Sequence, residues 1–304
     1  MSIAYTDGAF VPRAGIMVNP ADFGFARGVA LFELARVYGG VPFHLADHLD
    51  RLAHGAQMLG IPLPLALPEL ARVTQVVIAR NALAHSAIKF YLTAGECRTP
   101  AWHNFADCRV FTPHLMVLED EVRPEHPEAP YGVELYQRGQ RLKTVPFERE
   151  LPTIKSTNYM LGYYAAREYA GTEWDDILFT HRDGYITEAT RSNFFCVLDG
   201  VLCTPRRGML LGITRKVVLY LAGKLGIPVA ERDLRPADLL QATEAFTTGS
   251  IAELHPVRAL DDHILAATHD GPVYTKLRSA FTSYVQEQYR MGGGAALVTL
   301  DQPR

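Results

Sequence analysis

Apolar residues follow two different periods along the chain, and the change of period predicts an α+β fold. One group recurs at the three- and four-residue spacing of a helix face: Leu45, Leu49, Leu52, Ala56 and Leu59. Gly60-Ile61-Pro62 then ends the predicted helix. A second helix is expected over 68–84, and the β-rich runs 31–38 and 87–93 flank this helical pair.

Beyond residue 130 the pattern predicts mainly short strands, at 133–136, 177–179, 185–187, 194–198, 201–204 and 245–248. Helices are expected at 158–169, 215–225 and 236–241. The segment 119–130 contains three prolines among charged residues, which is the composition of a linker. We therefore predict a small α+β domain over 1–118, an interdomain linker over 119–130, a larger domain over 131–290, and a flexible tail over 291–304.

Composition narrows the class of protein. The chain has 304 residues, 48% of them hydrophobic and 21% charged, which is ordinary for a soluble protein of enzyme size and ample to bury a large core. A net charge of -3 without a Lys/Arg tract argues against nucleic-acid or acidic-membrane partners. Neither a signal peptide nor an apolar run of membrane-spanning length is present, so a cytoplasmic location without membrane contact is expected. The four cysteines lack CxxC spacing, which favours reduced thiols over disulfides or a metal site.

Lys155 is the first candidate for chemistry. It is the lone charged residue of the run 151–159, where an apolar strand end broken by Pro152 changes into a helical stripe. An ammonium that is short of partners and partly desolvated loses proton affinity and becomes an amine nucleophile suited to Schiff-base chemistry. A surface lysine at a helix start fits the same pattern, so other residues must decide.

Three later features complement this amine. Gly212-Ile213-Thr214 opens a predicted helix with Thr214 as N-cap, a place where phosphate binds readily, although Thr is also an ordinary cap. Thr247-Thr248-Gly249-Ser250 follows a strand and offers hydroxyls to an anion, or forms a polar loop. Glu188 ends the strand 185–187 and faces either a cationic heterocycle or solvent. An amine, two phosphate-ready turns and a carboxylate together match the needs of pyridoxal 5'-phosphate.

These motifs occur in an order that resembles class IV aminotransferases, the fold-type IV enzymes that depend on pyridoxal phosphate. The resemblance extends from about residue 5 to 281 and rests on five motifs: Arg51 in His48-Leu49-Asp50-Arg51-Leu52, Lys155 with Asn158-Tyr159, Thr187-Glu188 before Asn193-Phe194-Phe195, Gly212-Ile213-Thr214-Arg215, and Gly249-Ser250 with Glu253 and Pro256-Val257. It implies a small N-terminal α/β domain, a larger pseudo-barrel domain that binds the cofactor, and a homodimer. The family contains branched-chain aminotransferases, D-amino-acid transaminases, R-selective amine transaminases and aminodeoxychorismate lyase.

The resemblance also implies roles for individual residues. Lys155 would bind the cofactor covalently and move a proton, Glu188 would pair with the pyridine nitrogen, and Tyr159 would bind the phenolic oxygen. The phosphate group would be held by Arg51, Ile213, Thr214 and Ser250. Phe32 and Ile251 would border the substrate. His48 and Arg51 lie beside the apolar stripe of their helix, which suggests that they reach a ligand.

The substrate pocket departs from the best-known members. Lys89 stands where branched-chain enzymes carry arginine, and R-selective amine transaminases carry an acid there. Ala101-Trp102-His103 keeps only the histidine of the Arg-x-His pair of D-amino-acid transaminases. Arg27 and Arg191 are additional arginines that, with Lys89, could clamp an α-carboxylate, although either could be structural.

We therefore expect ping-pong transfer of an amino group between an α-amino acid, preferably a D-amino acid, and a 2-oxo acid such as 2-oxoglutarate or pyruvate. A branched-chain L-amino-acid aminotransferase is the first alternative and aminodeoxychorismate lyase the second. A scaffold without cofactor is the non-enzymatic alternative.

Overall fold

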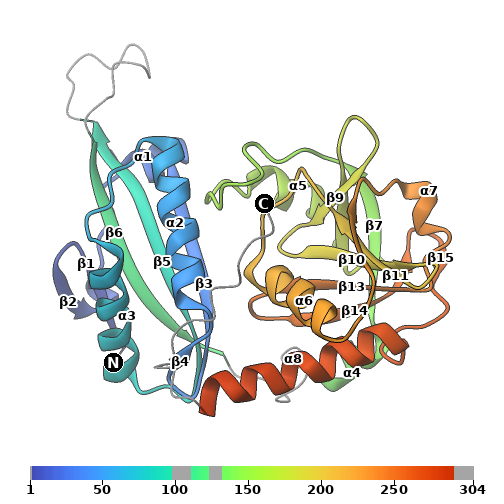
Figure 1. Ribbon diagram of the computed structural model, residues 1–304. Helices are drawn as coiled ribbons and strands as arrows, with labels where there is room; N and C mark the ends of the chain where they lie inside the picture. The colour runs from blue at the N-terminus through green and yellow to red at the C-terminus, as the bar shows by residue number, and fades with distance from the viewer. Residues whose placement is uncertain (1, 98–110, 123–131, 291–304) are drawn as a thin grey trace. The chain divides into compact units, whose positions relative to one another are not determined.

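The computed structural model describes residues 2–97, 111–122 and 132–290, which fall into two compact units (Figure 1). The first unit contains the chain up to Arg123 and, from later in the sequence, Ile154–Tyr159. The second contains the remaining described residues, 132–153 and 160–290. Three residues of the predicted linker, 119–121, belong to strand β6 (Phe111–Glu121). The rest of that linker beyond residue 122 and the predicted tail lie outside the described residues.

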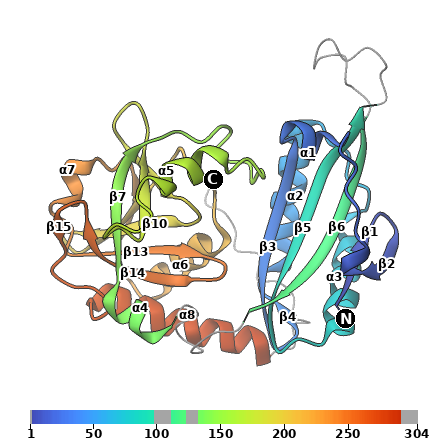
Figure 2. The same cartoon turned by 180° about the vertical axis from the view of Figure 1, so that it is seen from behind.

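The first unit is built on an antiparallel sheet that has, among the described residues, the strand order β2-β1-β6-β5-β3-β4. Its strands besides β6 are β1 (Ile3–Thr6), β2 (Ala9–Pro12), β3 (Ala30–Tyr38), β4 (Val41–Pro42) and β5 (His85–Cys97). Helices α2 (Leu45–Leu59) and α3 (Leu67–Asn81) cover one face of this sheet (Figures 1 and 2). Two short helical segments, η1 (Arg13–Gly15) and α1 (Phe23–Arg27), precede β3.

Alternation in β3 explains how the core of this unit forms. Leu31, Ala35 and Val37 are buried in one cluster with Leu49 and Leu52 of α2, because every second side chain of a strand points to the same face. Burying each of the large side chains stabilises the fold by roughly 1.5–3 kcal/mol. The helix and the strand predicted for this region are confirmed.

The second unit contains a sheet that closes on itself. Among the described residues its path runs β12-β11-β10-β13-β14-β7-β8-β9, β15 pairs with β14, and β9 also pairs with β10, which joins six of the strands into a barrel-like ring. The strands are β7 (Gln140–Pro146), β8 (Asp176–Thr180), β9 (Ile186–Ala189), β10 (Asn193–Leu198), β11 (Val201–Pro205), β12 (Val229–Arg232), β13 (Glu244–Gly249), β14 (Glu253–Leu260) and β15 (His263–Ile264). The predicted α+β class with a pseudo-barrel domain is thus confirmed.

Helices surround this ring. They are α4 (Val133–Arg138), α5 (Met160–Arg167), α6 (Ile213–Lys224), α7 (Pro236–Leu239) and α8 (Pro272–Arg290), and α6 and α8 pack against β13 (Figure 1). The strand predicted at 133–136 is wrong, because those residues form α4. Four residues are too few to separate the helical period from the strand period, and within α4 only Tyr136 is buried.

The cysteines differ in state. Cys97, at the end of β5, is disulfide-bonded, so the expectation of reduced thiols is wrong there, since spacing along a chain does not reveal which thiols the fold brings together. Cys196 and Cys203 are free and lie opposite each other on β10 and β11. Burial raises the pKa of both thiols. Within the described ranges, no helix has the length and hydropathy needed to cross a bilayer.

Candidate active site

Lys155 is fixed to the edge of β3 by backbone hydrogen bonds. The N–H of Phe32 donates to the carbonyl of Lys155 (3.0 Å), and the N–H of Thr157 donates to the carbonyl of Ala30 (3.0 Å). Ser156 forms an isolated bridge with Leu31. Helix α5 begins only at Met160, so Lys155 lies in an extended segment before the helix, and its position is set by the sheet of the first unit.

Aromatic rings lie next to the Lys155 amine. Its Nζ is 4.3 Å from the centre of the Phe32 ring, and the Tyr159 ring meets that ring edge-on at 5.7 Å between centroids. Tyr91 stacks on the Phe32 ring with centroids 6.3 Å apart. Lys155 is half-buried, so the amine is partly desolvated while its side chain is held against an aromatic wall. The structure thus brings together Lys155, Phe32 and Tyr159 of the predicted site.

Arg51 is anchored by Glu33, a residue that the sequence analysis missed. Arg51 Nε donates to Glu33 Oε1 (2.6 Å) and its Nη2 to Oε2 (2.9 Å), while His48 Nδ1 lies 2.7 Å from the same Oε2. His48 is buried, which corrects the suggestion that it reaches a ligand. An acid in the inward-facing register of β3, between Leu31 and Ala35, was the signal that could have found Glu33.

Burial and ion pairing shift the pKa values of Glu33 and His48. Burial raises the pKa of Glu33, but the Arg51 guanidinium and the His48 ring outweigh it and hold that pKa far below its ordinary value of 4.5. Burial also lowers the pKa of His48, against the hydrogen bond to Glu33, and the charges of Arg51 and Lys155 lower it further. Glu33 is therefore an anion that orients Arg51 at neutral pH.

Glu188 lies near the end of β9 within a set of donors from three segments. Arg149 Nη1 donates to its Oε1 (2.6 Å), and Asn193 Nδ2 (3.3 Å) and the Leu210 N–H (3.2 Å) donate to its Oε2. Only 5% of its side chain is exposed. Glu188 is thus buried rather than a surface acid, and Arg149, 39 positions away in sequence, is a partner that no local pattern could reveal.

The loop between β11 and α6 contains Gly208 and Gly212 and contacts Glu188 through the Leu210 N–H. Asn193 Nδ2 also donates to the Leu210 carbonyl (2.7 Å), which holds the loop after β11 over β9 and β10. A Cβ on Gly212 would overlap the Asn193 side-chain oxygen, and one on Gly208, which has φ +76°, would lie 2.8 Å from Thr187. The close approach of this loop therefore requires glycine at both positions.

The N-terminus of α6 is open to an anion. Gly212 is the N-cap, without a side-chain cap, and Thr214 is the second helical residue, so the prediction of Thr214 as N-cap is wrong. The sequence suggested Thr214 because threonine is a common N-cap residue. In the structure the helix begins two positions earlier, and the N-cap must be glycine because a Cβ there would overlap the Asn193 side chain. Uncapped N–H groups at the first turn of a twelve-residue helix suit a phosphate.

The remaining predicted residues are placed differently. Ser250 and Ile251 follow β13, and a Cβ on Gly249 would lie 3.5 Å from the Arg191 carbonyl, so the β9–β10 turn adjoins this loop. Arg191 is exposed on that turn. Lys89 pairs with Asp120 at 2.5 Å. Arg27 is exposed and donates to the Ala26 carbonyl (2.8 Å). The motif Ala101-Trp102-His103 lies outside the described residues.

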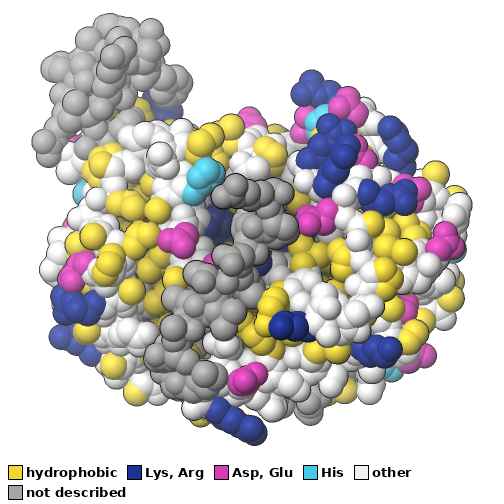
Figure 3. All heavy atoms as spheres, viewed as in Figure 1, with side chains coloured by type: hydrophobic (Ala, Val, Ile, Leu, Met, Phe, Trp, Pro, Cys, Tyr) yellow, Lys and Arg dark blue, Asp and Glu magenta, His cyan; other side chains and the backbone are white. Residues whose placement is uncertain are grey.

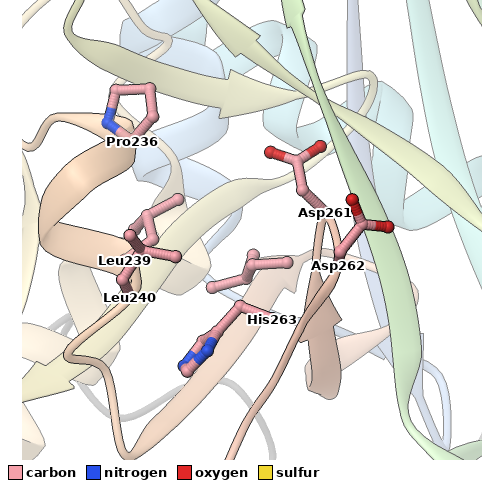
Figure 4. A pocket seen from close by; sticks show the side chains of 7 residues that line it. Pro236, Leu239, Leu240, Asp261, Asp262 and His263 are labelled. Atoms are coloured by element: carbon pink, nitrogen blue, oxygen red, sulfur yellow. The ribbon is translucent and has the colours of Figure 1, made fainter.

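Two other surface features contain none of the predicted site residues or do not suggest a further binding function. A cavity of about 370 Å³ in the second unit is lined by Pro236, Leu239, Leu240, Leu260, Asp261, Asp262 and His263 (Figure 4), none of which belongs to the predicted site. Asp261 there is already bound to Lys143 (2.9 Å) and to Thr144. On the face shown in Figure 3, basic and acidic side chains are interspersed, which is unlike a nucleic-acid footprint.

The described residues fit pyridoxal phosphate within each unit. The first unit offers a partly desolvated amine beside an aromatic wall and an oriented guanidinium. The second offers a buried carboxylate bound by a cation and, joined to it through Asn193, an uncapped helix start. Amine, carboxylate and anion-binding donors are the groups that an aldehyde, a pyridine nitrogen and a phosphate each require.

Comparison with known proteins agrees with this chemistry. The family profile described as "Amino-transferase class IV" matches residues 30–260. The chain is 30% identical over 278 residues to a D-alanine aminotransferase of Listeria monocytogenes, covering 90% of this chain and 93% of that protein. It is 28% identical over 272 residues to a branched-chain-amino-acid aminotransferase of Pseudomonas aeruginosa, covering 85% and 84%.

Among solved structures, a branched-chain amino acid aminotransferase from T.th. with pyridoxamine 5'-phosphate superimposes with a TM-score of 0.84 at 27% identity, covering 94% of this chain and 95% of that one. The family profile spans well over half of the chain, so the fold, the cofactor and the reaction type follow from membership. The chain belongs to the class IV aminotransferases and is a pyridoxal-phosphate-dependent transaminase.

Proposed function

We propose that this transaminase moves an amino group between a D-amino acid and a 2-oxo acid such as 2-oxoglutarate or pyruvate. The similarity to D-alanine aminotransferases at 30% identity supports this substrate class. Exposed Arg191, on the turn beside the loop that carries Ser250 and Ile251, is the observation that carries the proposal, because an α-carboxylate needs such a cation. We assign Arg27 a supporting role at the same carboxylate.

Lys89 is a weaker substrate ligand than the sequence suggested, because Asp120 already binds its ammonium. Burial raises the pKa of Asp120, but the contacts with Lys89 and Arg13 outweigh it and lower that pKa, so the Asp120 carboxylate is an anion at neutral pH. Phe32 and Ile251 border the substrate side chain in this proposal. The high structural similarity to a branched-chain enzyme favours branched-chain L-amino acids as the second candidate.

Pyridoxal phosphate, when bound, supplies an aldehyde that exchanges amines and a ring that withdraws electrons from the substrate Cα. Lys155 would provide the amine that holds this aldehyde and, as a free amine, the base that moves the Cα proton. Glu188 would accept a hydrogen bond from the ring nitrogen, and Tyr159 would donate to the phenolic oxygen. Arg51, the amides of Ile213 and Thr214, the Thr214 hydroxyl and Ser250 would hold the phosphate.

A panel of D- and L-amino acids with 2-oxoglutarate tests the substrate proposal. Glutamate formed from D-alanine supports it, glutamate formed only from L-leucine or L-valine supports the second candidate, and pyruvate released from aminodeoxychorismate without an acceptor identifies the lyase. Borohydride reduction followed by peptide mapping tests Lys155, because the reduced adduct must appear on that residue. An adduct on another lysine would refute the assignment. The homodimer and the cytoplasmic location remain predictions, to be tested by sedimentation and by fractionation.

A further inference from the structure

Arg149, three residues after β7, forms a buried ion pair with Glu188. The Nη1 to Oε1 distance is 2.6 Å, and 13% of the arginine side chain and 5% of the glutamate side chain are exposed. A charge-assisted contact of this length between two groups removed from solvent is far stronger than a surface ion pair. Arg149 is thus a cation bound directly to Glu188.

Two further donors reach the other oxygen of Glu188. Asn193 Nδ2 (3.3 Å) and the Leu210 N–H (3.2 Å) both reach Oε2 at the long end of the hydrogen-bond range, and both are neutral. They orient the carboxylate without compensating its charge. Because a bound cation favours the ionised form of a buried carboxylate, removing Arg149 should raise the proton affinity of Glu188.

Protonation would remove the function proposed for Glu188, because a neutral acid no longer attracts a protonated ring nitrogen. We propose that Arg149 is a positioning residue that keeps Glu188 ionised, so that Glu188 can hold a proton on the pyridine nitrogen of the cofactor. The inference rests on the proposed role of Glu188 and extends it to a residue outside the cofactor's own contacts.

Two substitutions separate charge from packing. Arg149→Met removes the cation and keeps most of the side-chain length, whereas Arg149→Lys keeps a cation. Lysine can replace the arginine here because the contact to Oε1 uses one guanidinium nitrogen. Arg182→Met removes an exposed arginine from the neighbouring β8–β9 turn, where 79% of its side chain is in solvent, and serves as the matched control.

The measurement is the affinity of the cofactor-stripped protein for pyridoxal phosphate between pH 6 and pH 9, followed by absorbance of the bound cofactor. In Arg149→Met the affinity at pH 6 should fall about 10-fold or more and recover as pH rises, since each unit of altered proton affinity is tenfold. Arg149→Lys and Arg182→Met should stay within about 3-fold of the wild type at every pH.

A loss in Arg149→Met that is equal at all pH values, or a failure of lysine to rescue, would show a purely structural role and overturn the inference. The double variant gives a second check: in a Glu188→Gln background, Arg149→Met should cause no further loss, because its effect passes through the carboxylate. An additional loss would overturn the inference too. A wild type that binds no cofactor would instead refute the proposed function, whereas normal wild-type binding with an unaffected Arg149→Met refutes only the role of Arg149.

Discussion

Replacing Glu33 by Gln should destabilise the protein strongly at neutral pH. The buried carboxylate accepts three contacts of 2.6–2.9 Å from Arg51 and His48. The amide of glutamine carries no charge, and its NH2 group would face a donor where an oxygen now accepts. Removing one partner of a buried ion pair leaves the other uncompensated, so the free energy of unfolding should fall by about 3–5 kcal/mol.

The pH dependence of this effect identifies its cause. Because the pKa of Glu33 is lowered on folding, its contribution is complete above the unfolded value of 4.5 and is lost as pH falls towards the folded value. The difference in unfolding free energy between wild type and Glu33→Gln should therefore narrow below pH 4.5 by about 1.4 kcal/mol per pH unit. Urea unfolding of both cofactor-stripped proteins at pH 7, 4.5 and 3.5, followed by circular dichroism, measures this difference in unfolding free energy.

Glu119 provides the control, since it is a buried acid of the same sheet with the opposite shift. Burial raises its pKa, against hydrogen bonds from Ser86 and Asn81, so its ionisation costs stability as pH rises above 4.5. Glu119→Gln should be at least as stable as the wild type at pH 7. A pH-independent loss in Glu33→Gln, or equal losses in both variants at pH 7, would refute the reasoning.

Three further expectations follow from single positions. Gly212→Ala should weaken pyridoxal phosphate binding about 10-fold, because the added Cβ displaces Asn193, whereas Gly223→Ala meets no atom within 4 Å and should leave binding unchanged; equal binding by the two variants would contradict a phosphate site at the start of α6. Native Cys196 should resist thiol reagents at pH 8 until urea unfolds the protein, because burial raises its pKa, and rapid labelling by Ellman's reagent would disprove this. Arg191→Ala should raise KM for amino acids about 10-fold or more with cofactor absorbance unchanged, and an unaltered KM would exclude Arg191 from the carboxylate site.

Patterns that repeat locally were sufficient for much of the fold. The helix over 45–59 could be predicted because five periodic positions fix which face is buried, and the strand over 31–38 could be predicted from its β-rich composition before Gly39-Gly40. The segment 133–136 offered too few positions. Helix α8 was not predicted, although its buried residues Tyr274, Leu277, Phe281 and Val285 recur at helical spacing. Periodicity can thus predict long amphipathic elements and fails where the element is shorter than two turns.

The candidate site was predicted in part for a different reason. Lys155 and Glu188 stood out because a charged residue interrupts an apolar or strand context, and such interruptions are visible along the chain. Glu33 carries the same local signal, an acid among apolar strand positions, and was overlooked, although its partner Arg51 lies 18 positions away. Arg149 could not be found in this way, because its partner Glu188 lies 39 positions away, a separation that only the fold bridges. Likewise, Gly212 replaced Thr214 as N-cap because of a neighbour on another strand.

The segment Ile154–Tyr159 follows part of the second unit in sequence but belongs to the first unit, where it is hydrogen-bonded to β3. Neither unit is therefore a continuous stretch of chain. A fragment that starts at residue 132 would carry Lys155 in its sequence but would lack the strand that fixes its backbone, while a fragment that stops before residue 132 would lack the lysine altogether. Cutting this gene product between its two units therefore cannot yield two self-sufficient halves. Cleavage after Glu128 by a glutamate-specific protease should be tolerated only while both pieces stay associated, and separate expression of the second piece should give a protein that does not retain its coenzyme.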